Sequence, residues 1–173
     1  MDSFVIREAR PDEHGALGQL MVSAYASLEG FPTPAEQPKY YEMLANIGQL
    51  AARPATRLLV AVEGPTLLGG VVFFSDMAQY GSGGTATQER GAAGFRLLAV
   101  AHAARGRGVG RALAERCVQL AREQGLAQVI LHTTGAMQVA WRMYEAMGFT
   151  RSPDLDFLQQ GLPVFGFRLP LRS

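Results

Sequence analysis

The sequence predicts a mixed α/β fold, with a central, mostly antiparallel sheet flanked by helices. The chain has 173 residues, which is the length of a single domain over residues 1–173. Short β-rich runs alternate with stretches in which apolar residues recur at helical spacing. A tight turn joins two of the β-rich runs, which is typical of an antiparallel hairpin. The predicted order of elements is β-α-α-β-β-β-α-β-α-β.

The first half of the chain predicts one strand, two helices and a β-hairpin. Pro11-Asp12-Glu13 marks the start of the first helix, because proline suits the first helical turn and acidic side chains suit its positive end. Glu63-Gly64-Pro65 is a turn between two β-rich runs. The expected elements are a strand at residues 3–7, helices from Pro11 to Leu28 and from Tyr40 to Leu50, and strands at residues 58–62 and 67–74.

The second half begins with a long loop and continues with alternating strands and helices. Residues 75–94 contain many glycines and few apolar residues, which is typical of a functional or mobile loop. Cys117 lies on an apolar helical stripe and is expected in the core. The expected strands are at residues 95–100, 127–132 and 164–169, with a short strand near residues 155–157. One helix is expected to begin at Val109 and to end at Gly125. A second helix is expected to be capped by Thr133 or Thr134, to carry Val139, Met143 and Ala146 on one side, and to end at Gly148.

The charge balance and the cysteine count exclude several classes of protein. Sixteen basic and 15 acidic residues give a net charge of +1, which argues against a protein that neutralises nucleic-acid phosphates. One cysteine permits no internal disulfide, and three scattered histidines indicate no metal site. We see no basic leader, and the longest near-apolar run, Leu67–Phe74, is too short to span a bilayer. We therefore expect a cytoplasmic monomer or homodimer without nucleic-acid or membrane partners.

The most informative segment is a turn rich in glycine and arginine, between a predicted strand and a predicted helix. It consists of Arg105, Gly106, Arg107, Gly108, Val109, Gly110 and Arg111. Glycines let backbone N–H groups approach an anion, and the following helix adds unpaired N–H groups and a positive dipole end. The arginines add charge and forked donors. The turn therefore predicts an anion site, although a tight strand-to-helix turn would also use glycine.

Three known kinds of anion site are alternatives for this turn. The phosphate-binding Walker A pattern requires Gly-Lys-Ser/Thr, which does not follow here. The Rossmann dinucleotide pattern requires a glycine where Arg111 stands, if the run starts at Gly106. An arginine-driven nucleic-acid module is a third alternative, although Glu115 and Glu123 interrupt the basic region and no aromatic residues interleave with it.

Two motifs together resemble those of the GNAT superfamily of N-acetyltransferases. Arg105–Gly110 resembles the family's Arg/Gln-x-x-Gly-x-Gly/Ala signature, and Leu97–Val100 resembles its fourth strand. Ala140–Phe149 resembles the family's segment that ends in Tyr-Glu-x-x-Gly-Phe. The sequence departs from the family at two positions. Met137 stands where asparagine is frequent, and His102 stands where proline is frequent.

The resemblance implies a single GNAT-like domain whose fourth and fifth strands splay apart and whose co-substrate is acetyl-CoA. It implies that the pantetheine arm pairs with the backbone of Leu98, Ala99 and Val100, and that Met137 packs on this arm. The pyrophosphate is then expected on Arg105, Gly106, Arg107, Gly108, Val109, Gly110 and Arg111. An extended arm that carries amides can use an open strand edge in this way.

The implied reaction is direct transfer of an acetyl group to a primary amine of a small molecule or peptide. The leaving thiolate resembles that of cysteine, with a pKa of about 8.5, so a phenol with a pKa of about 10 can protonate it. Tyr144 is the candidate general acid. The base stays open between Glu89, Asp76 and a chain of waters. A non-catalytic acyl-CoA-binding or sensor protein of the same fold is the alternative, because Met137 replaces asparagine and the predicted fourth strand contains no acid.

The acceptor is expected to contact the least patterned segments, which are residues 29–39, 75–94 and 152–163. Side chains that could shape its pocket are the aromatic Phe31, Tyr40 and Tyr80 and, for a cationic acceptor, the acidic Asp154 and Asp156. The sequence does not choose between a small amine, an amino acid, an antibiotic and a peptide terminus.

Overall fold

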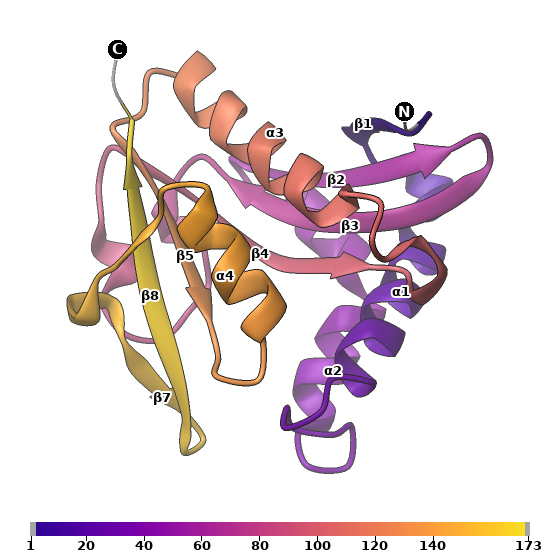
Figure 1. The fold of residues 1–173 in the computed structure, drawn as a ribbon, viewed down its shortest axis with the longest axis horizontal. Helices are drawn as coiled ribbons and strands as arrows, with labels where there is room; N and C mark the ends of the chain where they lie inside the picture. Colours follow the sequence, from indigo (N-terminus) through magenta and orange to yellow (C-terminus); the bar gives the residue numbers. More distant parts are fainter. Residues whose placement is uncertain (1–2, 172–173) are drawn as a thin grey trace. The chain divides into compact units, whose positions relative to one another are not determined.

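The computed structural model describes residues 3–171, and the predicted mixed α/β fold with a mostly antiparallel sheet is confirmed (Figure 1). The strands are β1 (Val5–Glu8), β2 (Thr56–Glu63), β3 (Thr66–Phe74), β4 (Ala92–Val100), β5 (Gln128–Thr133), β6 (Thr150–Arg151), β7 (Phe157–Gln159) and β8 (Leu162–Pro170). The α-helices are α1 (His14–Ala26), α2 (Pro38–Ala45), α3 (Val109–Glu123) and α4 (Gln138–Ala146). None of the helices in the described part of the chain is both long and apolar enough to cross a bilayer.

The described residues form two compact units. The first contains the residues up to Val72 together with Leu97–Arg116, and the second contains Phe73–Arg96 and the residues from Cys117 onward. The chain passes from one unit to the other within β3, β4 and α3, so each of these elements contributes to both.

In the first unit, the strands follow the order β1-β2-β3-β4, and β1 is antiparallel to β2. Helices α1 and α3 cover opposite faces of β3, with α3 in front in Figure 1. A Cβ atom added at Gly70 would lie 2.5 Å from Leu17 of α1, and one at Gly69 would lie 3.1 Å from Val109 of α3. Glycines in β3 therefore let the helices approach the sheet closely.

In the second unit, the strands follow the order β4-β5-β8-β6, and β7 pairs with β8. The pairing of β4 with β5 is parallel and joins Ala92–Gly94 to Gln128–Ile130, whereas β5 pairs with β8 antiparallel along its whole length. This short parallel pairing fits the predicted splay of the fourth and fifth strands. Helix α4 places the Trp141 ring 5.3 Å from Phe165 and 5.0 Å from Phe167 of β8, between ring centroids.

The segment predicted as a long loop at residues 75–94 is shorter and better packed than expected. Strand β4 begins at Ala92, and Met77, Tyr80 and Ala86 are buried. A Cβ atom at Gly94 would lie 2.7 Å from the Tyr80 ring and 2.8 Å from the Met77 sulfur. The glycine that indicated a loop is therefore a strand residue whose missing side chain makes room for the loop to pack.

Two helices also differ from the prediction. Helix α2 ends at Ala45, and residues 47–52 form a separate 3-10 helix, since Asn46 between them has backbone angles of −105° (φ) and +32° (ψ), which are not helical. Helix α4 begins after Met137 without a side-chain cap from Thr133 or Thr134. Val139 is 79% exposed, so the buried side of α4 is the one that carries Tyr144.

Candidate functional site

The glycine-rich turn lies in the first unit between β4 and α3 and has the backbone conformation of an anion-binding loop. Gly106 and Gly108 have φ angles of +81° and +79°, which favour glycine. A Cβ atom at either position would meet no atom within 4 Å. The backbone is therefore open to a ligand at both glycines. Because the first N–H groups of α3 have no partner within the helix, they complete a set of donors at this turn.

The three arginines of the turn differ in their partners. The Arg107 guanidinium makes two hydrogen bonds to the Glu63 carboxylate, at 3.2 and 2.9 Å. Arg111 is exposed and lies 3.4 Å from Glu115 in the next turn of α3. Arg105 is exposed and forms no ion pair with another described residue. Arg105 is therefore the arginine best placed to give its charge to an anion, and Arg107 contributes to the turn mainly through its backbone.

The last residues of β4 also lie in the first unit and carry a conformational irregularity. Leu97 has a φ angle of +63°, which is rare for a branched side chain and is common in bulges. After it, Leu98 and Val100 are half-buried, whereas Ala99 is buried. The Tyr25 hydroxyl of α1 donates to the Leu98 carbonyl at 3.1 Å. Tyr25 was not among the residues predicted for the site, although a tyrosine on a buried helical face usually has a partner for its hydroxyl.

A surface hollow of about 390 Å³ lies beside the end of β4. Its walls include Leu20 and Ser23 of α1, Leu67 of β3, Val100 at the end of β4, and Arg105 of the turn. His102, which stands where proline is frequent in the family, is exposed and belongs to the same wall. The turn therefore borders open space within its own unit.

Tyr144 lies in the second unit, on the buried side of α4. Its ring centroid is 5.9 Å from those of Phe95 and Phe149, and the side chain is 5% exposed. Burial raises the pKa of Tyr144 well above its ordinary value, and the nearby Cys117 raises it further. Cys117 itself is fully buried, as expected for a core residue. The Tyr144 phenol therefore keeps its proton at neutral pH.

Met137 immediately precedes α4 and is half-buried. Its sulfur accepts a hydrogen bond from the Thr133 hydroxyl at 3.3 Å, and its N–H donates to the Thr134 carbonyl at 3.0 Å. The loop between β5 and α4 is thus fixed by two contacts within the second unit. Met137, the last residue of this loop, has a thioether side chain where an asparagine amide is frequent in the family.

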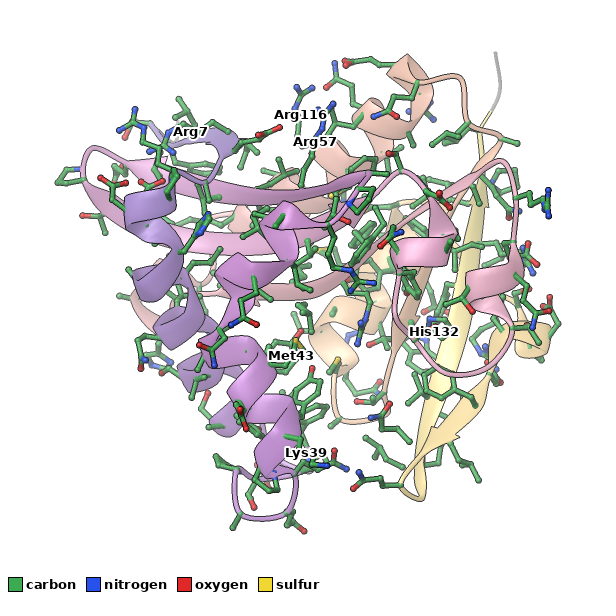
Figure 2. The ribbon with its side chains drawn as sticks, turned by 180° about the vertical axis from the view of Figure 1, so that it is seen from behind. Arg7, Lys39, Met43, Arg57, Arg116 and His132 are labelled. Atoms are coloured by element: carbon green, nitrogen blue, oxygen red, sulfur yellow. The ribbon has the colours of Figure 1, made fainter. Side chains whose placement is uncertain are left out.

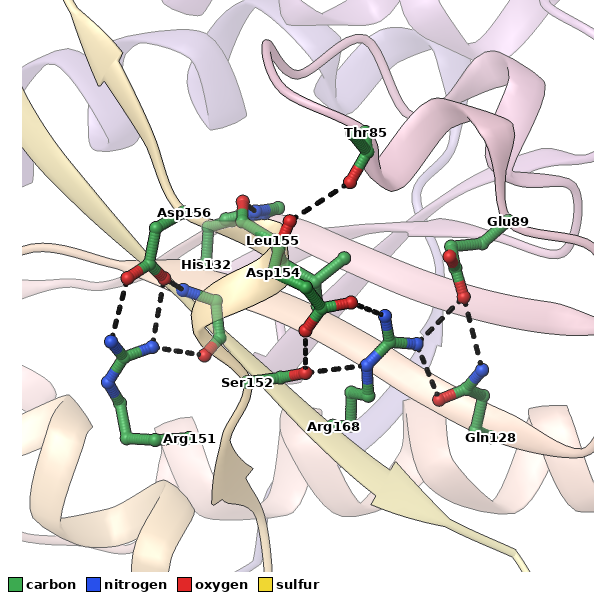
Figure 3. Close-up of polar contacts among 11 residues, drawn as sticks. Thr85, Glu89, Gln128, His132, Arg151, Ser152, Asp154, Leu155, Asp156 and Arg168 are labelled. Carbon is green, nitrogen blue, oxygen red and sulfur yellow. Dashed lines mark hydrogen bonds and ion pairs between the residues drawn. The ribbon is translucent and has the colours of Figure 1, made fainter.

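The acidic side chains that were candidates for a base or for acceptor binding all have partners, and Figure 3 shows those of Glu89, Asp154 and Asp156. Glu89 accepts from Arg168 at 2.7 Å and from Gln128. Asp76 accepts from the N–H of Ala78 and caps a 3-10 helix. The partner of Asp154 is Arg168, and the partner of Asp156 is Arg151. These carboxylates therefore have structural contacts that the sequence did not indicate.

A part-buried series of hydrogen bonds that the sequence did not indicate contains His132 of β5, labelled in Figure 2. The Tyr80 hydroxyl lies 2.9 Å from His132 Nδ1, and His132 Nε2 lies 2.9 Å from the Leu155 carbonyl. Tyr80 is fully buried, so it is not available as open aromatic lining for an acceptor. These hydrogen bonds join the 75–91 loop, β5 and the turn after β6.

Comparisons with known proteins place the chain in a family. A sequence model described as the Acetyltransferase (GNAT) family matches residues 18–149, and the chain belongs to this family. The predicted family resemblance is thus confirmed. The mouse protein named "Probable N-acetyltransferase family 8 member 5" is 44% identical over 55 residues, which are 32% of this chain and 24% of the mouse protein. The matched segment therefore spans about a quarter of that relative's length.

Solved structures share the fold over nearly the whole chain. The PaiA N-acetyltransferase of Thermoplasma acidophilum, in complex with coenzyme A, has a TM-score of 0.73 at 16% identity and covers 98% of this chain and 100% of its own. YncA of Salmonella typhimurium, with its cofactor acetyl-CoA, has a TM-score of 0.67 at 20% identity and covers 99% of this chain and 96% of its own. At these identities the similarity shows a common fold.

Proposed function

We propose that the protein is an acetyl-CoA-dependent N-acetyltransferase that acetylates a primary amine of a small molecule or peptide. Membership of the GNAT family carries this proposal, and the open turn at Gly106 and Gly108 supports it. Two structural neighbours are described with coenzyme A or acetyl-CoA, which supports the same co-substrate here. We expect the protein to act in the cytoplasm, as a monomer or homodimer.

Within this proposal, the turn binds the pyrophosphate through backbone N–H groups and through Arg105 and Arg111. The open backbone at Gly106 and Gly108 fits this role, because a phosphate oxygen can approach where a side chain would project. Leu98, Ala99 and Val100 provide backbone groups for the pantetheine arm, and Met137 packs on it. Tyr25 holds the Leu98 carbonyl, which fixes the strand at this point.

Acetyl-CoA supplies an activated thioester, and the chain supplies orientation and a proton. The amine nitrogen forms a bond to the carbonyl carbon, the carbon–sulfur bond breaks, and the sulfur receives the Tyr144 proton. Burial raises the pKa of Tyr144, so the phenol still carries its proton when the thiolate develops. The amine loses one proton to a base. Because Glu89 and Asp76 are engaged elsewhere, we assign that proton to a chain of waters, which returns a proton to the Tyr144 phenolate and completes the cycle.

The proposal is tested by mixing the protein with acetyl-CoA and a panel of primary amines, including peptide N-termini, and following free thiol. Tyr144→Phe should reduce kcat by about 10²–10⁴-fold, the range for general acid catalysis, and leave the coenzyme A Kd near that of the wild type. Tyr41→Phe is a matched control, because Tyr41 is also buried and its hydroxyl donates to the Pro32 carbonyl. Failure of the wild-type protein to bind coenzyme A at micromolar concentration would contradict the proposal.

A non-catalytic acyl-CoA-binding protein is the second candidate, and Met137 in place of the frequent asparagine is the observation that favours it. Such a protein would bind acetyl-CoA and release no thiol with any amine in the panel. Turnover by the wild type that Tyr144→Phe removes would decide against it.

A further inference from the structure

Two adjacent threonines at the end of β5 have different surroundings in the second unit. Thr133 and Thr134 are both buried, at 2% and 5% exposure. The Thr133 hydroxyl donates to the Met137 sulfur. Among residues 3–171, the Thr134 hydroxyl is the single buried side-chain nitrogen or oxygen atom without a hydrogen-bond partner. The two side chains therefore form a matched pair, one with a partner and one without.

An unpaired buried hydroxyl is unfavourable, because it gives up its hydrogen bonds to water and receives none in return. Native structures contain few such groups, and each one requires an explanation. Local disorder is not the explanation here, since the Thr134 carbonyl accepts from the Met137 N–H at 3.0 Å and fixes the backbone. Valine has the same shape and would avoid the penalty. A functional partner for the hydroxyl would explain the threonine.

We propose that the Thr134 hydroxyl donates a hydrogen bond to an amide carbonyl of the pantetheine arm, and so contacts the cofactor where this chain lacks the frequent asparagine. The inference rests on the proposed function. Met137 cannot donate from its side chain, and its sulfur is already occupied by Thr133. Thr134 stands three residues earlier, on the same loop, and brings the donor that the thioether does not have. A rotation between staggered χ1 positions turns the hydroxyl without moving the backbone.

The chemistry of the arm fits one hydroxyl donor. Pantetheine carries two amide groups, each with a carbonyl that accepts a hydrogen bond, whereas the nucleotide end of coenzyme A carries phosphates that favour charged donors and backbone N–H groups. A neutral, buried hydroxyl therefore favours the arm over the phosphates. The phosphates are better matched by Arg105 and by the glycine-rich turn.

The proposal predicts opposite effects of Thr134→Val on the free protein and on its complex. Without ligand, the variant should melt about 2–4 °C higher, because an unsatisfied hydroxyl is removed from the interior. Its Kd for coenzyme A should rise about threefold to tenfold, the range for one hydrogen bond between uncharged groups. Its Kd for adenosine 3′-phosphate 5′-diphosphate, which lacks the arm, should not change. Thr134→Ser keeps the hydroxyl and should bind coenzyme A like the wild type.

Thr133→Val is the matched control, since it removes a hydroxyl that has a partner in the free protein. It should lower the melting temperature and leave the coenzyme A Kd within about twofold. Two results overturn the inference alone: unchanged coenzyme A binding by Thr134→Val while the wild type binds, or a lower melting temperature for the ligand-free variant. Absence of coenzyme A binding by the wild type overturns the proposed function and the inference with it, and calorimetry distinguishes these cases.

Discussion

Glu63, at the end of β2, holds the Arg107 guanidinium by two hydrogen bonds, at 3.2 and 2.9 Å. The Arg107 side chain also lies over the Phe4 ring, 5.9 Å from its centroid. The Arg107 guanidinium and the Ser3 hydroxyl hold the pKa of Glu63 below its ordinary value. Arg107 therefore joins the predicted anion-binding turn to β2, and this contact distinguishes Arg107 from Arg105 and Arg111.

The first prediction separates Arg105 from Arg107 in coenzyme A binding. Arg105→Ala should raise the coenzyme A Kd about 10–100-fold, because hydrogen bonds to charged groups contribute about 1.5–3 kcal/mol. Arg107→Ala should raise it less than about threefold, since that guanidinium is engaged by Glu63. Calorimetric titration measures both, and Arg90→Ala, at an exposed position outside the turn, is the control. An equal loss in the two turn variants would show that Arg107 leaves Glu63 to bind the ligand.

The second prediction concerns two glycines of the same turn. Gly108→Ala should lower the free energy of unfolding by about 1–2 kcal/mol, because alanine is strained at a φ of +79°. Gly110→Ala should raise it by about 0.5–1 kcal/mol, since Gly110 lies in α3 and an added Cβ would meet Val100 at an ordinary 3.4 Å. Urea unfolding of the ligand-free protein measures both changes. A stabilised Gly108→Ala protein would be inconsistent with the left-handed conformation.

The local parts of this structure could be predicted because neighbouring residues determine them. The alternation of glycine and arginine at residues 105–111 indicated an open turn before a helix, and the structure has both. Gly148 has a φ of +102° and ends α4 as expected. Backbone conformation and helical periodicity depend on residues a few positions apart, so the sequence alone contains this information.

The side-chain partners could not be predicted, because they join residues far apart in the chain. Arg168 and Glu89 are separated by 79 positions, and Tyr80 and His132 by 52. Before folding, many carboxylates are equivalent partners for one arginine, and only the strand order selects among them. For the same reason Glu89 was a candidate base, although it is a member of an ion pair. Gly94 also indicated a loop, because the close approach of Tyr80 that explains this glycine joins residues that are not neighbours in the sequence.

The third prediction tests Glu89 as a base. Glu89→Gln should leave kcat within about threefold and reduce stability by about 0.5–1 kcal/mol, the range for a partly exposed ion pair. The reason is that Glu89 is occupied by Arg168 and Gln128 (Figure 3). Steady-state kinetics and urea unfolding measure the two effects. Asp76→Asn, at the other candidate, is expected to give a similarly small change in kcat. A hundredfold fall in kcat for Glu89→Gln, with normal coenzyme A binding, would assign it the base role.

The fourth prediction is that His132 makes the protein less stable as the pH falls below about 6.5. Burial lowers the pKa of His132 in the folded state, and nearby Arg96 lowers it further, whereas the Leu155 carbonyl and Asp156 act in the opposite direction. Because the unfolded chain binds a proton at a higher pH than the folded protein does, unfolding is favoured progressively as the pH falls through 6.5.

His132→Gln removes this proton uptake, and the glutamine amide can still donate or accept towards Tyr80. The decrease in the free energy of unfolding between pH 7.5 and pH 5.5 should therefore be smaller in the variant than in the wild type, even if the variant is less stable at both. Urea unfolding at several pH values measures the difference, and staying above pH 5 avoids the titration of most carboxylates. His102→Gln, at an exposed position, should keep the wild-type pH dependence. An unchanged pH dependence in His132→Gln would mean that His132 binds a proton equally well in the folded and unfolded states.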